Sequence, residues 1–365
     1  MKIASHEIIV VDNPLERPFM AAGVIPSSSL RHVILKLRTD DGIEGLGWSF
    51  SHSHRMLPAL VSAIDDIATH IEGADPLMRE AIAADILKVT GWAGEGMTHW
   101  VQATINIALW DIAGKALGQP IWKLLGGHSA ETVPTYASGH MWRDYTLDEL
   151  SETAGELKER GFTGMKFRCG AEATAADEGE RARVVRQAVG DDVQLMIDIN
   201  GGWDIPRTVA AARQFEAYDI FWLEDPIDHR DLQGYRQLVN LLDISITQGE
   251  YYYGYQSFLT LVNAGAADIV MIDTHHVGGI DGWMKAAAIC NAAHRPIATH
   301  LSPEIAVHLG AAAPGVMMVE YMPWSFGLFN EPMEIDAAGR LKVPQTPGLG
   351  VSLNEDAIKR GAVTD

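Results

Sequence analysis

The chain has 365 residues, of which 47% are hydrophobic, a formal net charge of −20 and two cysteines. This length and composition predict a globular protein with a sizeable core, built as two domains or as one large barrel with an appendage. The acidic balance argues against nucleic acid and anionic membrane surfaces as partners. Two cysteines cannot form a disulfide framework, the N-terminal segment does not resemble a signal peptide, and no apolar run has membrane length, so a cytoplasmic protein is expected.

The first third of the chain predicts an α+β unit. In HVILKLRTDDGIEGLGWSF a β-branched run meets Asp41-Gly42 and a second apolar run follows, which is typical of a β-hairpin. The later stretch TINIALWDIAGKALGQP predicts a helix that ends at Gly118 and Pro120. The residues expected on its apolar face are Ile105, Leu109, Ile112 and Ala116.

From Val133 the pattern changes to short apolar strands that alternate with helix-like segments, which predicts parallel β/α units. A charged residue lies at or just past the end of each of six successive strands: Asp198, Glu224, Glu250, Asp273, His300 and Glu320. One such residue per unit is typical of a β/α barrel with its active site at the C-terminal face. The alternative is a doubly wound open sheet, which does not bring so many consecutive strand ends to one centre.

Three of these strand-end residues indicate a metal site. Asp198, Glu224 and Glu250 are each 26 residues apart in sequence, and three converging carboxylates repel one another unless a cation is present. Carboxylate oxygens with room for water and substrate suit Mg²⁺. Each acid alone could instead cap a helix, but three at equal spacing favour the metal.

The strand sequence GMKFRCG places two cations on one face. Lys166 and Arg168 are two residues apart, so both side chains are expected in the barrel interior, where they could hold a substrate carboxylate. A solvated surface strand is the alternative. The apolar character of Met165, Phe167 and Cys169 on the other face argues against it, because that face must pack against helices.

Asp273 and His300 are expected to form a dyad, because an aspartate that accepts from one imidazole nitrogen raises the basicity of the other. Glu320 could donate a hydrogen bond to a developing enolate oxygen if it is protonated. An isolated histidine is more often structural, and the sequence does not favour the four others near these segments, His52, His54, His275 and His276.

Together these residues resemble the enolase superfamily and, within it, the mandelate racemase subgroup. The resemblance rests on the helix sequence ALWDIAGKALGQPIWKLLGG, the Lys166-x-Arg168 strand, the strand-end residues and the late PGLGV. It implies a (β/α)7β modified TIM barrel over residues 126–344. It also implies an α+β capping domain over residues 1–125, closed by the C-terminal tail at about 345–365.

The resemblance also implies a shared partial reaction, in which Mg²⁺ and cationic groups bind a substrate carboxylate and a base removes the α-proton to give an enolate. Carried over to this chain, it implies metal ligands at Asp198, Glu224 and Glu250, a base dyad of His300 with Asp273, and an electrophile at Glu320. Lys166 matches the first lysine of the subgroup's Lys-x-Lys motif.

Arg168 departs from the subgroup, which has a second lysine there as the base for the opposite substrate face. Arginine stays protonated in proteins, with a pKa of roughly 12 or more, so it is a poor proton acceptor. One base argues against racemisation and suits dehydration of a sugar acid: His300 takes the α-proton and then protonates the departing β-hydroxyl. The expected product is a 2-keto-3-deoxy acid.

Two alternatives remain open. A cycloisomerase, epimerase or racemase of a sugar acid or lactone would use the same enolate, with Lys166 as second acid or base. A barrel that binds metal but has lost activity is the non-enzyme alternative, and the intact set of Asp273, His300 and Glu320 argues against it.

Substrate selection is expected from two loops of the capping domain, residues 17–32 and 48–56, together with Asn200 and Trp324. A dicarboxylic substrate needs a second cationic anchor, for which the loops offer Arg17, Arg31 and Arg55. The expected partner is therefore a small sugar acid, and a homo-oligomer is expected.

Overall fold

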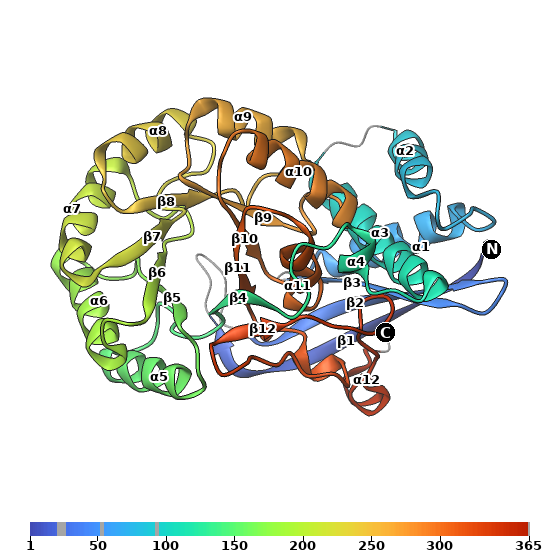
Figure 1. Ribbon diagram of the computed structural model, residues 1–365, viewed down its shortest axis with the longest axis horizontal. Coiled ribbons are helices and arrows are strands. Elements are labelled where there is room, and N and C mark those ends of the chain that lie inside the picture. The colour runs from blue at the N-terminus through green and yellow to red at the C-terminus, as the bar shows by residue number, and fades with distance from the viewer. Residues whose placement is uncertain (20–26, 52–54, 92–94, 364–365) are drawn as a thin grey trace.

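A computed structural model describes residues 1–19, 27–51, 55–91 and 95–363. Parts of both loops expected to select the substrate, residues 20–26 and 52–54, lie outside the described residues. Figure 1 shows a ring of strands and helices beside a smaller unit that contains the N-terminal strands and the first helices.

The N-terminal unit begins with an antiparallel sheet in the order β1 (Ile3–Phe19), β2 (Ser27–Thr39) and β3 (Glu44–Ser51). The expected hairpin is confirmed, since β2 pairs with β3 from Arg31 with Ser51 to Arg38 with Glu44. Its turn contains Gly42 at φ +88°, a backbone conformation that L side chains rarely adopt.

Four helices follow in the described part of this unit: α1 (Leu57–His70), α2 (Arg79–Val89), α3 (Met97–Leu117) and α4 (Ile121–Leu124). The expected helix is α3, and it ends at Gly118 in the left-handed conformation, as predicted. Ile105, Leu109 and Ile112 are buried, but Ala116 is exposed because it lies in the last turn, beyond the buried stretch that ends at Gly114.

Asp111 of α3 links three segments of the chain. Its carboxylate is fully buried and accepts hydrogen bonds from Leu46 N in β3 at 2.9 Å, from Leu349 N in the C-terminal tail at 2.9 Å, and from Lys115 Nζ at 2.6 Å. The tail also forms β-bridges to this unit, between Gly348 and Pro120 and between Ala362 and Val11.

Replacing Asp111 with alanine is expected to lower the free energy of unfolding by about 3 kcal/mol, because two backbone N–H groups and an ammonium lose a buried acceptor. Urea denaturation measures the change. The matched control is Asp66→Ala on the exposed side of α1, which should stay within about 0.5 kcal/mol of the wild type. Equal effects of the two substitutions would contradict the assigned role of Asp111.

Eight parallel strands within residues 132–321 form a closed barrel (Figure 1). They are β4 (Thr132–Ala137), β5 (Gly164–Arg168), β6 (Gln194–Asp198), β7 (Ile220–Glu224), β8 (Ser245–Gln248), β9 (Ile269–Asp273), β10 (Ile297–His300) and β11 (Val316–Tyr321). Pairing of β11 with β4 closes the ring, so the open-sheet alternative is wrong.

Seven α-helices alternate with these strands, which is the (β/α)7β order that was predicted. They are α5 (Leu147–Glu159), α6 (Ala175–Val189), α7 (Ile205–Phe215), α8 (Leu232–Leu241), α9 (Gln256–Ala264), α10 (Ile280–Ala292) and α11 (Pro303–Ala312). The remaining elements are the 3-10 helices η1 (Glu216–Tyr218) and η2 (Phe326–Leu328), the strand β12 (Arg340–Lys342) antiparallel to β4, and α12 (Glu355–Gly361).

The two faces of β5 are as the sequence predicts. Met165, Phe167 and Cys169 belong to the main core together with residues of the surrounding helices, whereas Lys166 Nζ lies 5.5 Å from the ring of Tyr136 inside the barrel. Apolar side chains fill that interior: Tyr136, Met196, Trp222, Ile269, Met271, Ala298 and Met318. The polar side chains at the strand ends therefore rest on a packed layer.

The described helices also bear on membrane insertion. None of them combines the length and the apolar character that crossing a bilayer requires.

The domain boundaries at residues 125 and 344 stay a prediction. The β-bridges between the C-terminal tail and the N-terminal unit support it.

Candidate active site

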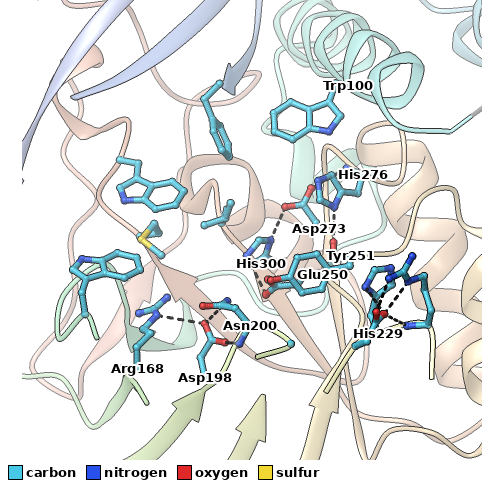
Figure 2. Close-up of a pocket in the computed structure, with 18 residues that line it drawn as sticks. Trp100, Arg168, Asp198, Asn200, His229, Glu250, Tyr251, Asp273, His276 and His300 are labelled. Carbon is cyan, nitrogen blue, oxygen red and sulfur yellow. Dashed lines mark hydrogen bonds and ion pairs between the residues drawn. The ribbon is translucent and has the colours of Figure 1, made fainter. Parts of the chain in front are cut away.

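A cavity of about 480 Å³ lies at the C-terminal ends of the barrel strands. Its floor is polar, with Asp198, Glu250 and His300 among its residues, and its lining from the N-terminal unit is aromatic, with Phe50 and Trp100. Figure 2 shows Arg168, Asp198 and Asn200 on one side of the cavity and Asp273 and His276 on the other, with His300 and Glu250 between them.

The predicted metal ligands gather at this floor. Asp198 and Glu224 are the last residues of β6 and β7, and Glu250 lies two residues past the end of β8 rather than at its end. Glu224, Asp225 and Glu250 each offer an oxygen within 4.8 Å of the others, and all three are buried. Asp225 was not among the predicted ligands, although it directly follows Glu224 at the same strand end.

The charge of this cluster favours a bound cation. Burial raises the pKa of Glu224 well above its usual value, and repulsion from Asp198 and Glu250 raises it further, against the opposing effect of Lys166. Burial and the same neighbouring carboxylates also raise the pKa of Asp225, whose Oδ2 is buried without a hydrogen-bond partner among the described residues. A divalent cation would relieve this repulsion, and an all-oxygen donor set fits Mg²⁺.

Lys166 lies beneath the cavity rather than in its lining. Its side chain is 1% exposed, and Nζ lies 2.6 Å from Glu224 Oε1 and 2.9 Å from Glu320 Oε1. Burial lowers the pKa of Lys166, but the two carboxylates outweigh this effect and raise it well above its usual value. Lys166 therefore supplies the positive charge that allows Glu224 to be buried at the end of β7.

Glu320 differs from the expectation of a protonated carboxyl. Burial raises its pKa, but the nearby charges of Lys166 and His300 lower it to about 2, so the ionised form is favoured. Its Oε2 accepts a hydrogen bond from Leu301 N at 2.7 Å. Of the two cationic groups beside Glu320, His300 lines the cavity and could donate a proton into it, whereas Lys166 does not line it.

Arg168 lines the cavity beside Asp198. Its guanidinium carbon lies 4.2 Å from the ring centre of Trp142, and Nε lies 3.4 Å from Asp198 Oδ2. Nη1 is buried without a hydrogen-bond partner among the described residues. A buried N–H group that faces a cavity can bind an anionic ligand, so the geometry supports a role for Arg168 as an anchor.

Asn200 lies just after β6 with φ at +50° and lines the cavity. Its Nδ2 donates to Asp198 Oδ2 at 3.0 Å and its backbone N donates to Asp198 Oδ1 at 2.8 Å. Arg143 Nη2 in turn donates to Asn200 Oδ1 at 2.8 Å. Arg143, which the sequence did not single out, therefore fixes Asn200, and Asn200 orients the Asp198 carboxylate.

The predicted dyad is present. His300 Nδ1 lies 2.7 Å from Asp273 Oδ2, and Nε2 lies 3.2 Å from Glu250 Oε2. Burial lowers the pKa of His300, but Glu250 and Asp273 outweigh it and raise the pKa to about 10. With Asp273 holding the proton on Nδ1, Nε2 is the nitrogen that can exchange a proton toward the cavity.

Two histidines that the sequence did not favour support this dyad. The backbone N–H groups of His275 and His276 donate to Asp273 Oδ1 at 2.7 and 2.8 Å, which fixes the carboxylate that orients His300. The ring of His276 also lines the cavity. His52 and His54 lie outside the described residues.

The three arginines considered as second anchors do not line the cavity. Arg17 Nη1 donates to Thr153 Oγ1 at 3.4 Å, Arg31 Nε lies 3.8 Å from Asp12 Oδ2, and Arg55 is exposed. Arg230 in the loop after β7 lines the cavity instead. The position of Arg230 soon after the predicted strand that ends at Glu224 could have indicated this role. Loops that follow the strands of a β/α barrel form its active-site face.

A buried acid lies behind the wall that contains Trp324. Glu304 of α11 accepts a hydrogen bond from Ser325 Oγ at 2.5 Å, and burial raises its pKa from 4.5 to about 7. A raised folded-state pKa favours the neutral form, so wild-type stability should fall as the pH rises from about 4.5 through about 7.

Glu304→Gln removes this titration, so the free energy of unfolding of the variant relative to the wild type should rise by about 3 kcal/mol between about pH 4.5 and pH 8. Urea denaturation at both pH values provides the comparison, with Glu216→Gln in an exposed 3-10 helix as the control. An unchanged difference between variant and wild type at the two pH values would contradict the buried-acid assignment.

Two family models match the chain. Residues 5–126 match the mandelate racemase / muconate lactonizing enzyme N-terminal domain, and residues 149–357 match the enolase C-terminal domain-like model. The L-talarate/galactarate dehydratase of Salmonella typhimurium is 32% identical over 94% of this chain and 87% of its own length. The D-galactarolactone cycloisomerase of Agrobacterium fabrum is 29% identical over the full length of both proteins.

Solved structures agree with these matches. The L-talarate dehydratase of Polaromonas sp. JS666, complexed with Mg and L-glucarate, superimposes with a TM-score of 0.93 at 31% identity, covering 100% of this chain and 98% of the other. The chain therefore belongs to the enolase superfamily, as a member of its mandelate racemase/muconate lactonizing enzyme family.

Proposed function

We propose that this protein is a Mg²⁺-dependent acid-sugar dehydratase, which removes the α-proton of a sugar acid and eliminates the β-hydroxyl to give a 2-keto-3-deoxy acid. The observation that carries the proposal is the asymmetry of the cavity. A His300–Asp273 dyad lies at one side, and Arg168, which cannot act as a base, lies at the other. Similarity to the L-talarate/galactarate dehydratase supports it.

The proposed ligands of Mg²⁺ are Asp198, Glu224 and Glu250, with Asp225 close by. When bound, the cation would stabilise the negative charge that develops on the substrate carboxylate during α-proton removal. Arg168 would bind and orient the same carboxylate through its unpaired Nη1. Lys166, held by Glu224 and Glu320, adds a fixed positive charge below this position, which favours the enolate.

Proton movement is assigned to His300. The form of His300 that acts as a base is the neutral imidazole, with Asp273 accepting from Nδ1. Mg²⁺ bound to Glu250 would offset the carboxylate charge that raises the pKa of His300, so that Nε2 can take the α-proton. The resulting imidazolium then gives that proton to the β-hydroxyl, so that C–O cleavage releases water and leaves an enol. Ketonisation of the enol gives the 2-keto-3-deoxy acid. The single histidine serves as base and then as acid on one face of the substrate.

A cycloisomerase or epimerase is the second candidate, which the similarity to the D-galactarolactone cycloisomerase supports. It would need a second acid or base, and Lys166 was the expected group. Lys166 is buried in two ion pairs and does not line the cavity, which favours dehydration over this alternative. The intact dyad argues against an inactive metal-binding barrel.

The proposal is tested by incubating the Mg²⁺-loaded enzyme with a library of sugar acids and assaying for 2-keto-3-deoxy products. A reaction in D₂O should place deuterium at C3 of the product, while recovered substrate keeps its configuration. A product isomeric with the substrate, formed without loss of water, would replace the dehydratase proposal with the cycloisomerase or epimerase candidate.

Arg168→Lys is expected to introduce slow α-epimerisation, because a lysine at this position can be deprotonated near Mg²⁺ and Lys166 whereas arginine cannot. Chiral chromatography of substrate recovered from the variant measures the epimer. The matched control is Arg168→Met, which also removes the guanidinium but adds no base and should form no epimer. Epimer formation by the wild type would contradict the one-base mechanism.

A further inference from the structure

The upper wall of the cavity is aromatic and has fixed geometry. Phe50 of β3 packs edge-on against Trp100 of α3, with ring centres 5.3 Å apart, and against Trp324 after β11 at 5.7 Å. All three line the cavity opposite the carboxylate floor. These faces can cover the carbon skeleton of a sugar, but they offer no positive charge to a second carboxylate.

Only two arginines, and no lysine, line the cavity within the described part of the chain: Arg168 and Arg230. Arg168 lies next to Asp198, at the end where the reacting carboxylate is proposed to bind. If Arg168 binds the reacting carboxylate, a second carboxylate at the far end of the same substrate would have to be bound by Arg230 or by neutral groups.

Arg230 is already neutralised by its neighbour. Its Nε lies 2.9 Å from Asp228 Oδ1 and its Nη2 lies 2.5 Å from Asp228 Oδ2, so one carboxylate occupies both donors. The side chain is 78% exposed, which weakens any charge that it presents to the cavity. The pair Asp228–Arg230 therefore contributes almost no net charge to this part of the wall.

Two further polar groups on this side, His229 and Tyr251, are neutral. His229 stacks on Tyr251 with ring centres 5.2 Å apart, and burial lowers the pKa of His229, so its ring is uncharged near neutral pH. In Figure 2 these two residues lie on the side of the cavity away from Arg168. Such groups exchange hydrogen bonds with hydroxyls, whereas the carboxylates of Glu250 and Asp273 repel a second anion.

Among the described residues that line the cavity, the only lysine or arginine distant from Arg168 is Arg230, which is paired with Asp228. A neutral far end of the substrate would meet aromatic rings and the uncharged side chains of His229 and Tyr251 there.

We propose that the substrate is a monocarboxylic polyhydroxy acid, with a neutral hydroxylated or cyclic-ether far end, and not a dicarboxylic sugar acid. This inference rests on the proposed function for the position of the reacting carboxylate. Selectivity follows from the missing partner for a second charge, because burying an unpaired carboxylate beside an acidic floor is unfavourable.

The test uses pairs of acids with the same configuration that differ only at the far carbon, such as D-galactonate with galactarate and D-gluconate with D-glucarate. For the best configuration, kcat/KM of the monoacid should exceed that of the diacid by about 10-fold or more. A diacid that is turned over better than its monoacid partner would overturn the inference, while it would leave the dehydratase proposal standing.

Binding separates this inference from the proposed reaction. Calorimetry with Mg²⁺-loaded His300→Asn enzyme measures affinity without turnover, and the monoacid of the best pair should bind about 10-fold more tightly. Tighter monoacid binding with no dehydration by the wild type would refute the reaction but support the substrate class. Failure of both acids of every pair to bind, or tighter diacid binding, would refute the substrate class.

Two variants test the neutralised arginine. Asp228→Asn frees the guanidinium of Arg230, so the ratio of diacid to monoacid kcat/KM should rise by about 10-fold. The double variant Asp228→Asn/Arg230→Met should lose this gain, because the freed cation is absent. If Arg230→Met alone lowers the diacid-to-monoacid ratio by a similar factor, Arg230 already binds a second carboxylate and the inference is wrong.

Discussion

Replacing His300 with asparagine is expected to lower kcat by about 10³-fold or more, because the cavity then lacks its base and the acid derived from it. Asparagine is similar in size and cannot accept the α-proton at neutral pH. The measurement is the rate of 2-keto-3-deoxy product formation with the best sugar acid. Exchange of the substrate α-proton with D₂O should fall by a similar factor, because both events use Nε2.

Two controls distinguish loss of the base from loss of the site. Mg²⁺ affinity of His300→Asn, measured by calorimetry, should stay within about 10-fold of the wild type, since the proposed ligands are unchanged. Asp273→Asn keeps His300 but no longer fixes its tautomer, so its loss of kcat should be smaller than that of His300→Asn. Near wild-type turnover by His300→Asn would show that the base lies elsewhere.

Removal of divalent metal with EDTA is expected to abolish turnover, and added Mg²⁺ should restore it. The reason is that four carboxylates, Asp198, Glu224, Asp225 and Glu250, lie close together without a divalent cation to offset their charge. Burial and mutual repulsion raise the pKa of Glu224 and of Asp225. Thermal unfolding gives an independent readout, because Mg²⁺ at 100 times its Kd should stabilise the fold by about 2.7 kcal/mol. Full activity of metal-free enzyme would exclude the proposed cofactor.

Single substitutions decide which carboxylates hold the cation. Asp198→Asn is expected to weaken Mg²⁺ binding by about 100-fold or more. Asp225→Asn should have a smaller effect, because in the wild type Asp225 Oδ1 already accepts a hydrogen bond from Tyr235 Oη at 3.3 Å. The two variants are matched in charge and size, and calorimetry compares them directly. A larger loss in Asp225→Asn would replace the predicted set with Glu224, Asp225 and Glu250, the three whose oxygens lie closest together.

The barrel and its active-site face could be predicted because each β/α unit repeats one local pattern. The apolar runs that end at Asp198, Glu224, Asp273 and His300 are strands that end at those residues. Glu250 follows its strand by two residues, and Glu320 lies one residue before the end of its strand. Closure of a parallel barrel places all such ends at one face, so the order along the chain already implies that they meet. The β2–β3 hairpin and the end of α3 could also be predicted, because each depends on neighbouring residues. A turn sequence sets the hairpin, and Gly118 ends the helix.

Contacts between distant segments could not be predicted. The sequence does not show that Lys166 would be enclosed by Glu224 and Glu320 below the cavity, or that Glu320 would therefore favour the ionised form. Nor does it show that Arg143 fixes Asn200 across 57 positions. These outcomes depend on side-chain distances of about 3 Å, which local patterns do not determine.

The sequence by itself determined the family, the barrel order and the set of strand-end acids, because strand periodicity and the identity of each terminal residue are local properties. Only the tertiary structure decided what surrounds those acids. It placed Arg230 rather than Arg17, Arg31 or Arg55 at the cavity and paired it with Asp228. The charge that a ligand meets depends on which side chains the fold brings within a few ångströms, because Coulomb interactions and hydrogen bonds weaken steeply with distance.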